Sequence, residues 1–145
     1  MEELKSVLTG GSQSVIVLPN RRKPRLYFSK GDARERWTYS AFYPAYRWNA
    51  RVNRMMLRCK AWLGWVDAIK MPDTIGTLRD FLTVCLPTFT CGVVFVGTPG
   101  PAQKFTVQLW DDSKIIGYLK YGEKPAALAR LQREYVILKS LPKGI

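Results

Sequence analysis

The sequence contains no histidine, which excludes histidine-based metal sites, Ser-His-Asp triads and histidine general bases. Its three cysteines, Cys59, Cys85 and Cys91, are widely spaced and form no CxxC pair. This spacing argues against a disulfide framework and against a zinc site, and it favours a reducing compartment. We therefore predict a cytoplasmic location and no metal site within this chain.

Long apolar runs are also scarce. The longest uncharged stretch, residues 81–103, reaches the ~20 residues that a membrane-spanning helix requires. Prolines and glycines interrupt it at Pro87, Gly92, Gly97, Pro99, Gly100 and Pro101. A helix end, a turn and a buried strand explain this stretch better than a transmembrane helix does. Residues 1–13 are acidic and polar, unlike a signal peptide.

Acidic residues are few, with 11 Asp and Glu against 23 Lys and Arg, so the formal net charge is +12. Most of the excess lies in residues 21–70, which hold 13 basic and 3 acidic residues. Ten aromatic residues lie in the same segment. Any contact with a polyanion or an anionic membrane is therefore expected in that segment.

A helix is predicted near residues 44–63, with two neighbouring stripes along it. The apolar stripe repeats at spacings of four and three and consists of Trp48, Val52, Met55, Cys59 and Trp62. A basic stripe lies one residue earlier and consists of Arg47, Arg51, Arg54 and Arg58. We expect Val52, Met55 and Cys59 to pack the helix on a sheet.

The arginine stripe has four open interpretations. It can be a solvated helix face, or it can contact the headgroups of an anionic membrane. Arginine together with tryptophan also suits nucleic acid, through phosphate contacts and stacking. An anionic glycan or glycolipid would use the same features.

The remaining elements follow from local patterns. Strands are predicted at residues 14–19 and 26–29, followed by a polar loop, KGDARER. A second helix is expected near residues 77–86, where Pro87 ends it. Residues 91–96, 104–111 and 114–121 read as three strands, with a Gly/Pro loop after the first and a tight turn after the second. Pro125 begins a last helix.

Two charges in this last part stand where an ordinary core would exclude them. Lys120 interrupts an apolar strand, and Glu134 falls on the apolar stripe of the helix that follows. An unpaired buried carboxylate is costly, so we expect the Glu134 carboxylate to pair with the Lys120 ammonium. The Gly/Pro loop offers backbone N–H groups without bulky side chains, which suits phosphate oxygens. Lys104, just past the loop, can also face phosphate, but we expect it at a strand edge.

From about Val93 to its end, the chain resembles the amino-terminal lobe of protein-kinase-like phosphotransferases. It is most similar to the aminoglycoside-phosphotransferase-like branch. The segments GTPGPAQKFTVQLWDD, YLKYG and LARLQREYVILKSLP look like those of kinase-like proteins associated with bacterial surface-polysaccharide genes. The resemblance implies an α+β fold: a small antiparallel sheet with a packed helix over residues 91–145, preceded by a basic, partly helical extension over residues 1–90.

The resemblance also implies roles for individual residues. Gly97, Thr98 and Gly100 would belong to the phosphate loop. Lys120 would contact the α- and β-phosphates of ATP, and Glu134 would be its ion-pair partner. The catalytic residues and those that hold Mg²⁺ would lie in a carboxy-terminal lobe absent from this chain, which would then be inactive alone.

The implied function is ATP binding by the amino-terminal part of a transferase that phosphorylates a small molecule or glycan, in polysaccharide biosynthesis. The alternative is a non-catalytic basic module that docks on an anionic membrane, a glycan or nucleic acid. The resemblance favours the membrane surface or a glycan over nucleic acid, and hence a peripheral position at the inner membrane face.

Overall fold

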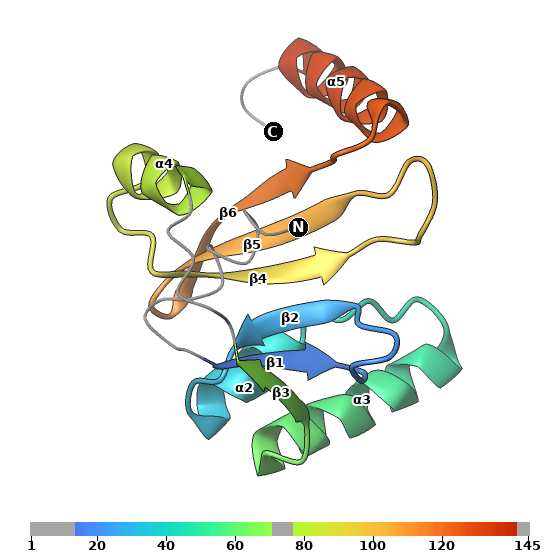
Figure 1. The fold of residues 1–145 in the computed structure, drawn as a ribbon, viewed down its shortest axis with the longest axis vertical. Coiled ribbons are helices and arrows are strands. Elements are labelled where there is room, and N and C mark those ends of the chain that lie inside the picture. The colour runs from blue at the N-terminus through green and yellow to red at the C-terminus, as the bar shows by residue number, and fades with distance from the viewer. Residues whose placement is uncertain (1–13, 71–76, 142–145) are drawn as a thin grey trace.

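The computed structural model describes residues 14–70 and 77–141 (Figure 1). They form an α+β fold, in which helices pack on both faces of a six-stranded sheet. The strand order is β3-β1-β2-β4-β5-β6, and every neighbouring pair is antiparallel. The α+β class expected from the sequence is confirmed.

Five of the six strands lie close to where the sequence predicts them, and β3 is the one that was not predicted. The six strands are β1 (Ser14–Leu18), β2 (Leu26–Ser29), β3 (Asp67–Lys70), β4 (Cys91–Val96), β5 (Phe105–Asp111) and β6 (Lys114–Tyr121). Strand β2 pairs with β4, where Leu26 lies opposite Phe95 and Tyr27 opposite Val94. The basic segment and the last 55 residues therefore share one sheet.

Four helices lie in the described ranges: α2 (Ala33–Ser40), α3 (Trp48–Leu63), α4 (Thr77–Cys85) and α5 (Pro125–Ser140). Helix α2 stands where we expected a polar loop. A capping box begins it, because the Glu35 N–H donates to Asp32 Oδ1 (2.8 Å) and the Asp32 N–H donates to Glu35 Oε2 (2.9 Å). The sequence carries this D-x-x-E signal. Strand β3 was also missed, since its four residues hold too little pattern.

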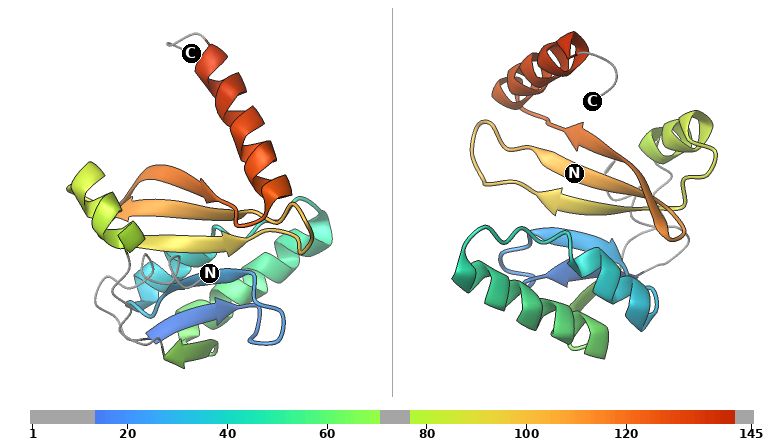
Figure 2. Two further views of the ribbon diagram at one scale, coloured as in Figure 1. Left: turned by 45° about the horizontal axis from the view of Figure 1, so that its top comes forward. Right: turned by 180° about the vertical axis from the view of Figure 1, so that it is seen from behind.

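Side chains of alternating direction build a core on each face of the sheet. On one face Val15, Val94 and Val107 pack with Leu82 of α4. On the other face Ile16 and Phe28 pack with Tyr39 of α2 and Ala61 of α3. Figures 1 and 2 accordingly show α2 and α3 together over the β1–β2 half of the sheet, while α4 lies apart from them.

Helix α3 packs on the side opposite to the one we expected. Val52, Met55 and Cys59 are exposed, so their assignment to the core is wrong. Ala61 is buried instead, with Leu57 packed against the same core. One member of the arginine stripe also turns inward, since the Arg58 guanidinium stacks 4.0 Å from the Trp37 ring centroid and its Nε donates to the Trp37 carbonyl (3.3 Å). Arginine can do so because its long apolar stem packs while its head stays hydrogen-bonded.

Replacing a buried aromatic side chain should lower stability far more than replacing an exposed one. Phe28 is fully buried, so Phe28→Ala should lower the free energy of unfolding by about 3–5 kcal/mol through lost burial and a residual cavity. Trp48 is 74% exposed, so Trp48→Ala should change it by about 0.5 kcal/mol or less. Urea denaturation of both variants checks this. An equal loss from Trp48→Ala would contradict the observed orientation of α3.

Candidate functional site

Three consecutive elements bring charged side chains together at one end of the sheet. Lys120 lies on β6 opposite Thr106 of β5. Lys104 comes two residues before Thr106, so its side chain leaves the same face of the sheet. Glu134 lies on α5, which follows β6 directly. The sheet register and the helix that follows it thus place two ammonium groups beside one carboxylate.

The Lys120–Glu134 ion pair expected from the sequence is present, with Lys120 Nζ 2.6 Å from Glu134 Oε2. Lys104 Nζ binds the other carboxylate oxygen, Oε1. Lys104, for which we weighed a strand edge against a phosphate contact, is therefore the member whose pairing with Glu134 the sequence did not predict. Its position at the base of the Gly/Pro loop was the available signal. We name these three residues, Lys104, Lys120 and Glu134, the lysine–glutamate cluster.

The lysine–glutamate cluster carries a net positive charge. The hydrogen bond from Lys104 and then that from Lys120 lower the pKa of Glu134 from 4.5 to about 2. Glu134 is therefore ionised at neutral pH, and two ammonium groups share a single carboxylate. About a third of the Glu134 side chain and almost half of the Lys120 side chain are exposed. The cluster is accessible and can accept a further anion.

The Gly/Pro loop, residues 97–103, closes directly onto the cluster. The Gly97 N–H donates to the Lys104 carbonyl (2.8 Å), and the Gln103 N–H donates to the Gly100 carbonyl (3.2 Å). A Cβ at position 97 would lie 2.5 Å from the Lys104 carbonyl oxygen, so this approach requires glycine. Lys124, at the start of α5, donates its Nζ to the Gly100 carbonyl (3.2 Å).

The loop offers fewer backbone donors than its length suggests. Pro99 and Pro101 have no N–H, and that of Gly97 is used in closing the loop. In the part of the chain that the structure describes, no hydrogen bond occupies the N–H groups of Thr98 and Gly100. Of the three loop residues predicted to contact phosphate, Thr98 and Gly100 therefore keep a donor for a ligand.

Small residues set the position of α5. Lys124 is its N-cap, and Pro125 occupies the first turn as expected. Gly122 is buried, and a Cβ there would lie 2.7 Å from the Cβ of Ala127. The first turn of α5 therefore lies close against the end of β6. Glu134 stands nine residues beyond Pro125, about 14 Å along the helix at 1.5 Å per residue.

The sheet face next to Lys120 is partly covered. Phe95, Thr106 and Lys120 form one row across β4, β5 and β6. In the next row Gln108 Nε2 donates to the Tyr118 hydroxyl (3.1 Å). The Phe42 ring lies over both rows, with its centroid 6.2 Å from that of Phe95 and 6.1 Å from that of Tyr118. Phe42 comes from the α2–α3 connection, and no sequence pattern placed it there.

A hollow of about 460 Å³ lies on the other side of Phe95, between β4 and the start of α3. Gly97 and Thr98 form part of its wall, so it borders the Gly/Pro loop. Tyr43, Tyr46 and Asn53 contribute aromatic rings and an amide. Its size and mixed lining suit a small organic group.

The four arginines of the predicted stripe do not share one environment. Arg47 and Arg51 are exposed, whereas Arg54 is half-buried and Arg58 is held against Trp37. The structure thus brings Lys120, Glu134 and the glycine loop together but divides the arginine stripe.

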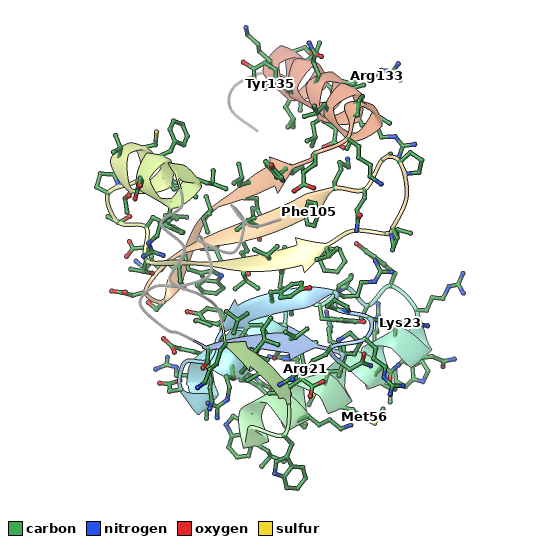
Figure 3. All side chains as sticks on the ribbon, in the orientation of Figure 1. Arg21, Lys23, Met56, Phe105, Arg133 and Tyr135 are labelled. Atoms are coloured by element: carbon green, nitrogen blue, oxygen red, sulfur yellow. The ribbon has the colours of Figure 1, made fainter. Side chains whose placement is uncertain are left out.

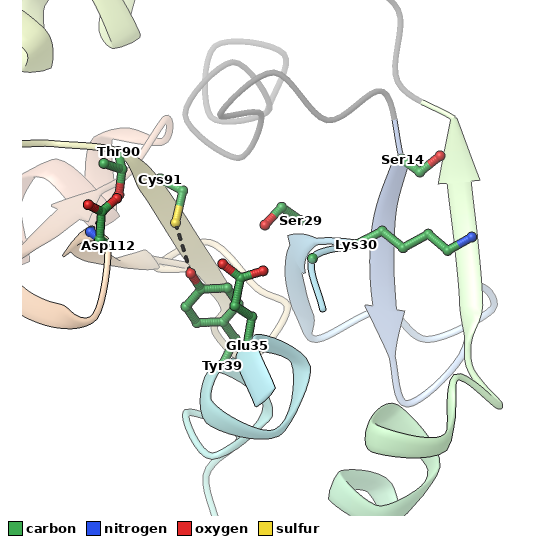
Figure 4. A pocket seen from close by; sticks show the side chains of 9 residues that line it. Ser14, Ser29, Lys30, Glu35, Tyr39, Thr90, Cys91 and Asp112 are labelled. Carbon is green, nitrogen blue, oxygen red and sulfur yellow. Dashed lines mark hydrogen bonds between the residues drawn. The ribbon is translucent and has the colours of Figure 1, made fainter. Parts of the chain in front are cut away.

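A second hollow, also about 460 Å³, lies near the β5–β6 turn (Figure 4). The Tyr39 hydroxyl hydrogen-bonds to the Cys91 sulfur there (3.3 Å). Burial raises the pKa of both groups, so the thiol stays protonated and is a poor nucleophile. Glu35, also in the lining, is used in the α2 capping box. Neither Cys91 nor Glu35 is therefore an activated group in this hollow.

No protein-family model, curated protein or solved structure matches this chain. Within residues 14–70 and 77–141 no three His, Cys, Asp or Glu side chains are grouped to hold a metal ion. No helix of those two ranges is long and apolar enough to cross a bilayer. The geometry of the lysine–glutamate cluster is therefore the basis for a functional proposal.

The low pKa of Glu134 makes the cluster sensitive to acid. Because the folded pKa is below the unfolded value, its contribution to stability is present above about pH 4.5 and is lost as the pH falls towards about 2. Lys104→Ala and Lys120→Ala should each raise the pKa of Glu134, and the double variant should bring it near 4.5. Carboxyl NMR titration measures this, with Lys114→Ala on the same strand as the control. A wild-type pKa near 4.5 would show that the cluster does not form.

Proposed function

We propose that this chain is the ATP-binding amino-terminal part of a kinase-like phosphotransferase that acts on a small molecule or a glycan. The observation that carries the proposal is the lysine–glutamate cluster at the base of the Gly/Pro loop. A structural ion pair needs one cation for one carboxylate, whereas this cluster has two cations, both partly exposed. The unbalanced positive charge supports a phosphate ligand.

In this proposal the phosphates of ATP bind between the cluster and the loop. The Lys120 and Lys104 ammonium groups contact phosphate oxygens, and the Glu134 carboxylate holds both ammonium groups in position. The N–H groups of Thr98 and Gly100 supply neutral donors from the loop. Lys124, already hydrogen-bonded to the loop, adds a third ammonium group nearby.

The order of these parts supports the phosphotransferase class. A glycine loop joins the first two strands of the β4–β5–β6 meander, the lysine lies on the third strand, and the glutamate lies on the next helix. This is the layout by which kinase-like proteins position ATP. Phe42 covers the neighbouring sheet face. We therefore place the adenine ring of ATP against Tyr43 and Tyr46, in the hollow that shares Gly97 and Thr98 with the loop.

Helix α5 is consistent with a further lobe. Much of its apolar surface is exposed, with Tyr135, Val136, Ile137 and Leu138 each 60–63% accessible. Figure 3 shows Tyr135 on α5, the helix at the top of the view. In our proposal a carboxy-terminal lobe packs on this surface and supplies the catalytic residues and those that hold Mg²⁺. The chain by itself would bind nucleotide weakly and would not transfer phosphate.

The proposal predicts that one lysine of β6 matters for ATP and another does not. Lys120→Ala should weaken ATP binding to this chain about tenfold or more, because a charge-assisted hydrogen bond contributes about 1.5–3 kcal/mol. Lys114→Ala, at the other end of β6, should leave the affinity unchanged. NMR titration with ATP and with tripolyphosphate measures both affinities and shows whether the Thr98 and Gly100 amides shift.

Because the chain is strongly basic, nonspecific polyanion binding needs its own control. Arg51→Ala removes an exposed cation that belongs neither to the lysine–glutamate cluster nor to the lining of the hollow beside the loop, and it should not alter the affinity for ATP. If Lys120→Ala and Arg51→Ala have the same effect, or if ATP shifts only amides of α3, the proposal fails.

A further inference from the structure

Helix α3 turns a continuous apolar side outward. Its large apolar side chains there, Trp48, Val52, Met55, Met56, Trp62 and Leu63, are between 45% and 74% exposed. Cys59 is exposed among them. We call these seven residues the outer face of α3. Figure 3 shows Met56 at the lower margin of the molecule, on α3.

The outer face stands opposite the buried side of the helix. Residues on an α-helix are rotated by about 100° from one to the next, which places Val52 and Cys59 roughly 180° from Ala61. Ala61 is the fully buried contact of α3 with the core. The helix therefore has one apolar side that packs in the core and a second that contacts only solvent. An exposed patch of this kind marks an interaction surface.

Cations border the outer face. Arg51 lies along one border and Lys60 along the other, and both are exposed. Arg47 is exposed at the start of the helix, where it occupies the N-cap position. The sequence has no Asp or Glu between Glu35 and Asp67. The surface around the outer face is therefore positive, and its partner should be negative.

Aromatic residues stand at both ends of the outer face. Trp48 lies at the start of α3, and Trp62 and Trp65 lie at its end. Trp48 and Trp65 are both 74% exposed. Indole and phenol rings are favourable at the membrane interface, because an apolar body meets lipid while a polar group stays hydrated.

The charges argue against a second copy of this chain as the occupant. The spacing of Trp48, Val52, Met55, Cys59 and Trp62 would suit a paired helix, as in a coiled coil. However, two copies of α3 would bring like cations together along both borders without an acidic residue to offset them. An anionic surface offsets these cations, and a second α3 does not.

We propose that the outer face of α3 docks on an anionic lipid bilayer. The apolar side chains enter the boundary between headgroups and acyl chains, and Arg47, Arg51 and Lys60 contact lipid phosphates. The helix lies in the plane of the membrane, with the sheet on its far side. This site uses none of the lysine–glutamate cluster, so it goes beyond the proposed ATP binding and does not depend on it.

Vesicle sedimentation of the full chain tests the proposal. Vesicles of phosphatidylcholine with about 30% phosphatidylserine should bind the chain at least about tenfold more tightly than phosphatidylcholine alone, and added salt should weaken the binding. The double variant Val52→Asp/Met55→Asp should lose about tenfold or more of that affinity, because charge is placed in the apolar side. The matched control is Phe81→Asp/Val84→Asp on α4, whose side chains are even more exposed than Val52 and Met55, and it should bind as the wild type does.

Three results would overturn membrane docking. The first is no binding to the anionic vesicles. The second is equal binding by the Val52→Asp/Met55→Asp variant and its control while Arg51→Glu abolishes binding, which would indicate a general polyanion site. The third is a concentration-dependent dimer that Val52→Asp/Met55→Asp dissociates, which would make a second copy the occupant. Circular dichroism of each variant confirms that the fold is retained.

Discussion

The Glu134 carboxylate joins three parts of the structure at one point. It binds Lys104 at the end of the Gly/Pro loop and Lys120 on β6, and α5 carries it. Beyond its first turn, which contacts Gly122 and hydrogen-bonds to the loop through Lys124, helix α5 has little else to orient it, since Ala127 is its only fully buried residue and its apolar side chains are mostly exposed. Partly exposed ion pairs contribute only about 0–1 kcal/mol each, so the cluster orients α5 more than it stabilises the fold.

The lysine–glutamate cluster was partly predictable because its determinants are local. Lys120 and Glu134 lie on a strand and on the helix that follows it, so the side chains can meet without knowledge of the wider fold. Lys104 could not be assigned in the same way. Its contact with Glu134 depends on the β5–β6 register and on the closure of the loop by Gly97. Both are pairings between strands, which periodicity within one strand does not determine.

The orientation of α3 is a second feature that periodicity within one element does not determine. Periodicity identifies an apolar stripe but does not reveal whether a core covers it. In the structure the contact is made by Ala61, which allows close approach, and by Arg58 stacked on Trp37. That contact requires α2, where we expected a loop although the sequence carries the Asp32–Glu35 capping box. Without α2, the sequence offers no partner on which Arg58 could pack. The apolar side of α3 was therefore assigned to the core, and that assignment is wrong.

The pairing of β2 with β4 ties the two halves of the chain into one body. Helix α3 packs over β1 and β2, whereas Lys120 lies on β6 at the far edge of the sheet (Figure 1). Three strand steps of about 4.8 Å separate β2 from β6, which places that edge about 14 Å from β2. Because hydrogen-bonded strands fill that interval, the outer face of α3 and the lysine–glutamate cluster keep a fixed separation. A ligand bound at one therefore does not cover the other, and the chain can present its phosphate-binding end to solvent while α3 contacts a surface.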